Sequence, residues 1–164
     1  MKKAALSFAT LAALAALIPF SACKEKSDTG APAGTAAGLK TPAKPPVEGK
    51  LVILAELVDI PGQFPANELY NYAYVMKYKV LQVLQGSYAD PEILVGQYNP
   101  RIARNDIKDE QDSKVGGNLT SFQKGDVHYL VLNPLDGEWT GAVEDEYFND
   151  KRPRWWALWT DKAK

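Results

Sequence analysis

Residues 72–85 read YAYVMKYKVLQVLQ, rich in β-branched and aromatic side chains and free of both proline and glycine. This composition predicts a long β-strand, because such side chains pack well on a pleated, half-buried surface. One face of the strand carries Tyr72, Tyr74, Met76, Tyr78, Val80 and Leu84. The other face is apolar except in its middle, where Lys77 and Lys79 interrupt it. The pattern therefore predicts a strand that bends and changes neighbours along its length.

Further strand patterns lie on both sides of this segment. Upstream, residues 51–60 (LVILAELVDI) form an apolar run that the pair Pro61-Gly62 closes with a turn. Downstream, we expect strands at residues 92–98, 127–132 and 155–160. A charged segment between the third and fourth strands, residues 104–113 (RNDIKDEQDS), predicts one short helix that the pair Gly116-Gly117 stops.

Three strands, a short helix and two more strands is the element order typical of an OB-type barrel. We therefore predict an all-β fold with one short helix, a five-stranded OB-like barrel, with an open β-sandwich of the same strands as the alternative. The first two strands and their turn also resemble the start of the netrin-like domain of tissue inhibitors of metalloproteinases. That subset's zinc-chelating N-terminal cysteine and its disulfides have no counterpart here, since Cys23 is the only cysteine, and protease inhibition does not follow from the likeness.

The N-terminus carries an export signal. Two lysines precede an apolar run, Ala4 to Phe20, which is shorter than the ~20 residues of a spanning helix. The run ends in Phe20-Ser21-Ala22-Cys23, which resembles the lipobox of bacterial lipoproteins. The resemblance implies a signal peptide at residues 1–22, palmitate-type lipidation of Cys23, and an anchor in the lipid bilayer. In Gram-negative lipoproteins an Asp after the cysteine signals retention in the inner membrane, so by the same resemblance Lys24 implies the periplasmic face of the outer membrane. A cleaved soluble protein with a free Cys23 thiol is the alternative.

A tether separates this signal from the domain. Seventeen of the 27 residues from 24 to 50 are Ala, Gly, Pro, Ser or Thr, so almost nothing in the segment can be buried. Conformational entropy then dominates, which predicts that the lipidated cysteine and its tether (residues 23–50) are disordered. One folded domain remains, at residues 51–164.

Charge and residue counts exclude several functions for this domain. It has 12 basic and 17 acidic side chains, whereas an OB-type nucleic-acid binder needs a positive groove, and no nucleic-acid partner is expected. A single histidine, His128, and one cysteine cannot build a Cys/His zinc site. Ser121 and Asp126 lie near His128 in sequence, but nothing resembles a nucleophile elbow.

Two groups of carboxylates are candidates for calcium. They are Asp106, Asp109, Glu110 and Asp112, and then Asp136, Glu138, Glu144, Asp145, Glu146 and Asp150. Neither has the alternating spacing around a central glycine that an EF-hand loop requires. Solvated acidic faces are therefore the simpler interpretation, and we predict neither a cofactor nor a metal ligand.

All four tryptophans lie between Trp139 and Trp159. Trp155 and Trp156 are adjacent, so on a strand they face opposite ways, and Trp155 looks outward if Trp156 packs inside. The cluster either closes the end of the barrel or offers an aromatic platform to a sugar or a protein. The predicted binding face consists of Asn99, Arg101, Trp139, Trp155 and Trp156.

Three phrases resemble a family of small bacterial envelope proteins. They are residues 59–65 (DIPGQFP) with Leu69-Tyr70, residues 96–100 (GQYNP) and residues 141–148 (GAVEDEYF). Some of those proteins are encoded near membrane-bound O-acyltransferases of the alginate-acetylation type, which implies a link to exopolysaccharide modification, although no residue role is known to transfer. The sequence favours a non-enzymatic accessory lipoprotein that docks on an envelope protein assembly or its polysaccharide. The alternative is an envelope polysaccharide esterase or hydrolase that uses His128 or an Asp/Glu pair.

Overall fold

The computed structural model describes residues 47–163. The predicted signal peptide at residues 1–22, the lipid site at Cys23 and most of the predicted tether at residues 23–50 lie outside the described residues. Within the described part, the backbone N–H of Lys50 donates to the Asn133 side chain, 2.9 Å away, just before the first strand begins. None of the helices in this part is long and apolar enough to span a membrane.

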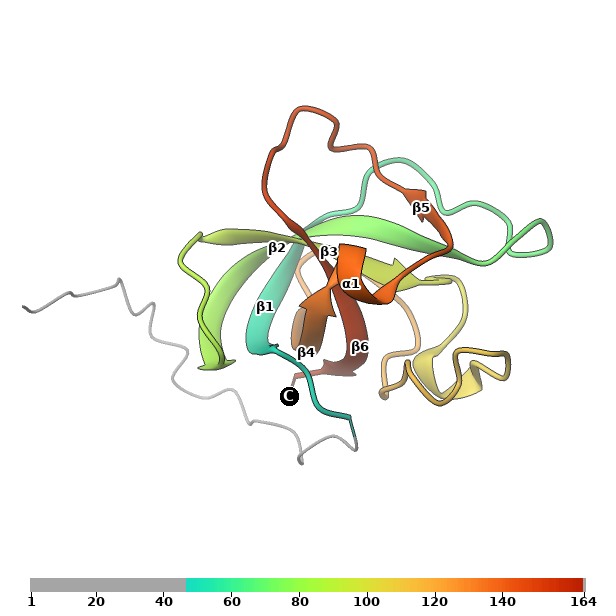
Figure 1. Ribbon diagram of the computed structural model, residues 1–164, viewed down its shortest axis with the longest axis horizontal. Coiled ribbons are helices and arrows are strands. Elements are labelled where there is room, and N and C mark those ends of the chain that lie inside the picture. Colours follow the sequence, from blue (N-terminus) through green and yellow to red (C-terminus); the bar gives the residue numbers. More distant parts are fainter. Residues whose placement is uncertain (1–46, 164) are drawn as a thin grey trace, which may run out of the picture. The chain divides into compact units, whose positions relative to one another are not determined.

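Five strands close into a barrel (Figure 1). They are β1 (Leu51–Asp59), β2 (Tyr72–Gln85), β3 (Glu92–Tyr98), β4 (Val127–Pro134) and β6 (Arg154–Lys162). Around the barrel the order is β1-β4-β6-β3-β2, and pairing of β2 with β1 closes the ring. Every neighbouring pair is antiparallel except β3 with β6. The predicted OB-like barrel is confirmed, and the sheet closes where the alternative had an open sandwich.

The predicted bend in β2 is also confirmed. From Ala73 to Lys79 this strand pairs with β3, and from Lys77 to Gln85 it pairs with β1. The exchange of neighbours takes place at the two lysines that interrupt the apolar face. Register shifts along the β1–β2 pairing accompany the curvature that closes a barrel of only five strands.

The barrel strands are buried on both faces. One cluster fills the interior, and its larger members include Ile53, Leu57, Tyr72, Met76, Tyr78, Ile93, Val95 and Leu132. A second cluster lies on the other face of the strands, under the chain that follows β3 and β4, and includes Leu54, Tyr98, Ile107, Val131, Leu135 and Trp156. Burial on both faces explains why the strands read as nearly continuous apolar runs.

The helix expected over residues 104–113 is wrong in its extent. Only Arg104–Asp106 forms a helix, the single 3-10 turn η1, and Ile107 is already extended. Arg104 is buried at 2% exposure and donates through Nη2 to the backbone carbonyls of Asn99 and Ile102, both 2.9 Å away. These contacts hold the backbone in a tight turn that a regular helix would pull apart.

Two short elements that the sequence did not predict lie between β4 and β6. One is the α-helical turn α1 (Leu135–Glu138), and the other is β5 (Ala142–Glu144), which pairs in parallel with the first residues of β2. Gly117, which the sequence assigned to a helix stop, has φ of +132°, and a Cβ there would lie 2.0 Å from the Thr160 carbonyl oxygen. Only glycine allows the chain to approach β6 this closely.

Candidate binding surface

Two long loops meet beside the start of β2. The first loop, residues 60–71, joins β1 to β2, and the second, residues 135–153, joins β4 to β6 (Figure 1). In OB barrels the corresponding two loops flank the ligand-binding face. We call the line along which these two loops meet the seam.

The seam is held at both of its ends. At one end, β5 pairs with residues 72–74, and the Tyr70 hydroxyl donates to the Glu144 carboxylate. At the other end, the Tyr147 hydroxyl donates to Asp59, 2.7 Å away, where the first loop begins. Lys124 also binds Asp59, so the pKa of this carboxyl is lowered, first by Lys124 and then by Tyr147. The two loops are thereby fixed as one surface.

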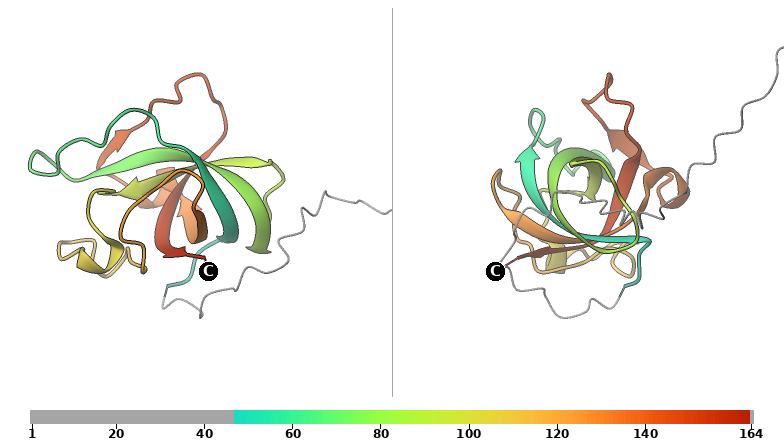
Figure 2. Two further views of the ribbon diagram at one scale, coloured as in Figure 1. Left: turned by 180° about the vertical axis from the view of Figure 1, so that it is seen from behind. Right: turned by 90° about the vertical axis from the view of Figure 1, so that its left-hand side faces the viewer.

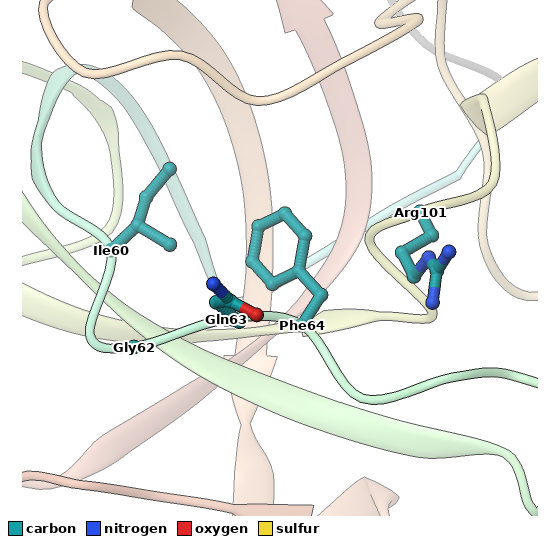
Figure 3. Close-up of a pocket in the computed structure, with 5 residues that line it drawn as sticks. All are labelled: Ile60, Gly62, Gln63, Phe64 and Arg101. Carbon is teal, nitrogen blue, oxygen red and sulfur yellow. The ribbon is translucent and has the colours of Figure 1, made fainter.

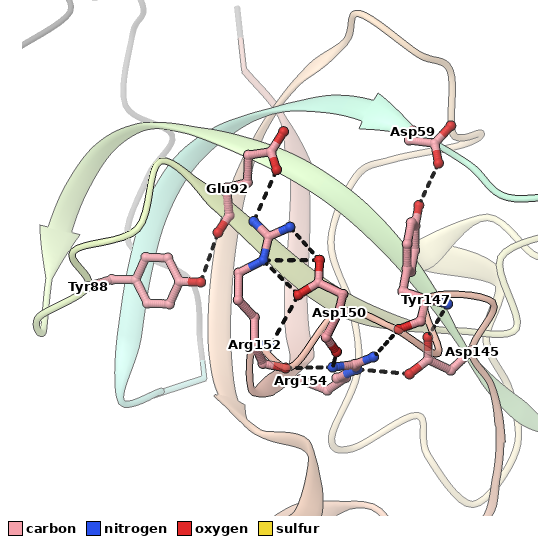
Figure 4. A network of polar contacts seen from close by, with 8 residues as sticks. All are labelled: Asp59, Tyr88, Glu92, Asp145, Tyr147, Asp150, Arg152 and Arg154. Carbon is pink, nitrogen blue, oxygen red and sulfur yellow. Dashed lines mark hydrogen bonds and ion pairs between the residues drawn. The ribbon is translucent and has the colours of Figure 1, made fainter.

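Two arginines stiffen the second loop (Figure 4). Arg152 pairs with Asp150 and with Glu92 on β3, 3.1 Å away, and the Arg152 guanidinium holds the pKa of Asp150 well below its usual range. Arg154 pairs with Asp145 at 2.8 Å and also donates to three backbone carbonyls of the same loop. A loop with this many internal hydrogen bonds presents its side chains in a defined arrangement.

Large apolar side chains are exposed along the seam. Among the described residues, the exposed large hydrophobic side chains are Leu69 (77%), Phe148 (75%), Val143 (43%) and Tyr70 (41%). All four belong to the two loops. Exposed apolar side chains confined to two joined loops indicate a candidate interaction site.

A shallow pocket lies at the first loop (Figure 3). Ile60, Gly62, Gln63, Phe64 and Arg101 line it, and its volume is about 340 Å³. The Phe64 ring stands between Ile60 and Arg101, and on its inner side it contacts the Tyr74 ring edge-on, with centroids 5.0 Å apart. Arg101 is exposed at the far end, so the pocket combines an apolar wall with one cation.

The predicted tryptophans do not form one platform. Trp139 stacks on Trp156, with ring centroids 4.8 Å apart, and both rings contact the edge of Tyr98. Trp156 is only 2% exposed, so this pair covers the barrel wall rather than offering two free faces. Trp155 does face the opposite way, as predicted, but it packs partly against the interior cluster and against Tyr88 instead of looking outward.

The two predicted polar residues of the binding face also separate. Asn99 is fully buried with φ of +35°, and its side chain accepts the Tyr72 N–H and donates to Asn71. It therefore fixes the start of β2 in place. Arg101 is exposed and lies with the first loop at the pocket, apart from the stacked tryptophans. The structure thus brings together Trp139 with Trp156 and leaves the other three predicted residues in separate surroundings.

The seam lies between residues 60–71 and 135–153, and the predicted binding face, which was built on the tryptophans, did not include it. The available signal was the set of three phrases: the first lies largely within the first loop, the third lies within the second loop, and the second contains Asn99, whose side chain accepts the Tyr72 N–H. The two loop sequences have no hydrophobic period, so the sequence alone does not indicate that the two loops contact each other.

His128 lies inside the barrel. It is 0% exposed, and burial lowers the pKa of its imidazole to about 4. Its Nδ1 lies 3.4 Å from the Tyr78 hydroxyl, which in turn accepts a hydrogen bond from Gln97. Asp126, which the sequence placed near it, pairs with Lys162. The imidazole is therefore a neutral core group, closed off from any substrate outside the barrel.

The acidic groups do not converge on a cation. Within residues 47–163, no three His, Cys, Asp or Glu side chains come together in an arrangement that could hold a metal ion. Asp109 instead accepts from the Tyr98 hydroxyl at 2.8 Å, and Asp145 and Asp150 bind the two loop arginines.

Comparisons with protein-family models, curated proteins and solved structures gave no match.

Proposed function

We propose that this chain is a lipid-anchored binding protein of the bacterial envelope, which docks through the seam onto an envelope assembly or its polysaccharide. The observation that carries this proposal is the gathering of exposed Leu69, Tyr70, Val143 and Phe148 in two loops that are fixed to each other. A rigid surface with exposed apolar side chains loses little conformational entropy when a partner covers it. OB-type barrels use the same two loops for ligands.

The direction of the chain supports an anchored binding role. β1 runs from Leu51 toward the first loop, so the chain arriving from the tether meets the barrel at the end opposite the seam (Figure 2). Anchoring on a tether raises the effective concentration of a weak binding surface near its partner.

The esterase or hydrolase alternative gains no support from the described residues. A general base must reach within hydrogen-bond distance of its substrate, and His128 is enclosed. Two carboxylates of the second loop, Asp145 and Asp150, are held by arginines rather than placed as a free pair.

The test is recovery of complexes from crosslinked cell envelopes, using the full-length lipoprotein. We expect a defined complex with the natural chain, and loss of that complex with the double variant Leu69→Ser, Phe148→Ser. Gln82→Ser, which alters an exposed position on the far half of β2, is the matched control and should leave recovery unchanged. Undiminished recovery with the double variant would overturn the proposed docking surface.

A further inference from the structure

We infer that the partner at the seam is a protein segment in which lysine or arginine flanks apolar side chains, an inference that rests on the docking function proposed above. The negative charge of the domain is concentrated in the two loops. Residues 60–71 and 135–153 together contain seven carboxylates and two basic side chains, a formal charge of −5. Over the rest of residues 51–164, ten basic side chains balance ten acidic ones. The charge therefore belongs to the surface that also exposes the apolar side chains.

Most cations near the seam already have partners. Arg152, Arg154 and Lys124 are engaged in ion pairs with Asp150, Asp145 and Asp59. Among residues 47–163, the exposed loop carboxylates without an ion pair are Glu68, Asp136, Glu138 and Glu146. Against these four, Lys151 is the exposed basic side chain of the two loops without an ion pair, Arg101 lines the pocket at the first loop, and Lys77 lies against the Tyr147 ring. The surface therefore has an unbalanced negative rim.

An anionic polymer does not fit this rim. A uronate-type polysaccharide or a nucleic acid would bring further negative charge against the free carboxylates, and the repulsion between like charges opposes association. A neutral sugar could stack on Phe148 or Tyr70, but the carboxylates would then contribute nothing to binding.

A basic and apolar protein segment uses both features. Its apolar side chains would cover Leu69 and Phe148, and its cations would meet the rim. The seam already shows this chemistry within the chain, because the Lys77 ammonium lies 5.0 Å from the centre of the Tyr147 ring. An incoming lysine or arginine can make the same contact with the exposed ring of Tyr70 or Phe148.

The experiment measures binding of four defined probes to the full-length protein by fluorescence anisotropy. The probes are a labelled lysine–leucine peptide, the same peptide with glutamate in place of lysine, polygalacturonate and dextran. We expect binding of the lysine–leucine peptide alone, weakened by added salt. Glu68→Lys and Glu146→Lys should each lower its affinity by about fivefold to tenfold, and Phe148→Ser should lower it by at least as much. Asp106→Lys makes the same charge change at an exposed site on η1 and should have little effect.

Every other outcome counts against this partner. Binding of polygalacturonate or dextran in place of the peptide would assign the seam to a polysaccharide. An equal loss with Asp106→Lys would trace peptide binding to net charge rather than to the seam, and no binding of any probe would also reject the basic segment. The two proposals fail separately: if Leu69→Ser, Phe148→Ser abolishes the envelope complex but salt and Glu146→Lys do not weaken it, docking stands and only the partner class is wrong.

Discussion

Among single side chains, the buried His128 couples the stability of the barrel to pH just below neutrality. Its imidazole is neutral inside the barrel because burial lowers its pKa to about 4, against about 6.5 in the unfolded chain. Between these two values the unfolded chain binds more protons than the folded chain, so stability falls as the pH falls. We expect the free energy of unfolding in urea to decrease by about 2 kcal/mol between pH 7 and pH 5 through this one group.

His128→Leu supplies the control for this pH dependence. The variant has no imidazole to protonate, so most of the decrease between pH 7 and pH 5 should disappear, whatever its stability at pH 7. A natural chain whose unfolding free energy is flat over this range would show that the imidazole is not buried in its neutral form.

The stacked tryptophans give a second prediction, because the two rings differ in burial. Trp156 is almost fully enclosed, and Trp156→Ala should destabilise the domain by about 3–5 kcal/mol. Trp139 is half-buried and its indole N–H donates to the carbonyl of Ala142 next to it, so Trp139→Ala should cost roughly 1–2 kcal/mol. Urea unfolding measures both. Similar small losses for the two variants would mean that the pair is a free platform after all.

Among strands and loops, the joined loops depend on a small number of side-chain ties. Tyr147→Phe removes the hydroxyl that binds Asp59, and such a hydrogen bond contributes about 1 kcal/mol. We expect faster amide hydrogen exchange over residues 142–150, because the second loop opens locally. The barrel strands should keep their protection.

Tyr88→Phe is the matched variant for this tie. Its hydroxyl donates to the backbone carbonyl of Glu92, the first residue of β3, and not to a residue of the second loop, so its loss should leave residues 142–150 unchanged. Equal exchange rates in Tyr147→Phe and the natural chain would show that β5 and the arginines hold the loop without Tyr147.

The barrel strands were predictable because local pattern and final burial agree. The β2 and β3 boundaries matched the prediction, and the lysines at the middle of β2 marked its change of partner. The helix predicted over residues 104–113 is not formed in full, although the apolar residues of this segment have helical spacing. The buried Arg104 instead fixes the backbone through contacts with carbonyl oxygens and with the Phe122 ring. No local pattern reports such a tertiary contact.

The seam and the tryptophans were hidden for different reasons. β5 is three residues long and exists because residues 72–74 offer it a free edge, which depends on where β1 ends. The tryptophan cluster was visible in the sequence, but the second cluster of buried residues on the outer face of the strands was not. A tryptophan that points away from the barrel interior was therefore expected to be exposed to solvent. Trp156 points away from the interior but is covered by α1 and its neighbours.

For the molecule as a whole, the relation between the tether and the seam decides how the protein would work. The described chain begins at one end of the barrel and the seam lies at the other, as both views of Figure 2 show. On the proposed function, the tether and the seam are thus connected to different ends of the barrel. Binding strength at the seam and delivery to the partner are then properties of separate parts of the chain.

This separation can be tested by changing the anchor without touching the barrel. Cys23→Ala should release the protein from the membrane fraction and lower recovery of the envelope complex by 10-fold or more, on the order of the effective-concentration gain of a tethered ligand. The affinity of the purified Cys23→Ala protein for the lysine–leucine peptide should stay within about twofold of the natural chain, because the seam is unchanged.

Deleting residues 26–40 while keeping Cys23 is the companion variant. It should retain the membrane association but reduce recovery of the complex, since a shorter tether reaches fewer partners. A Cys23→Ala protein that stays in the membrane fraction would refute lipidation at this cysteine. A deletion variant that recovers the complex fully would show that reach is not what the tether provides.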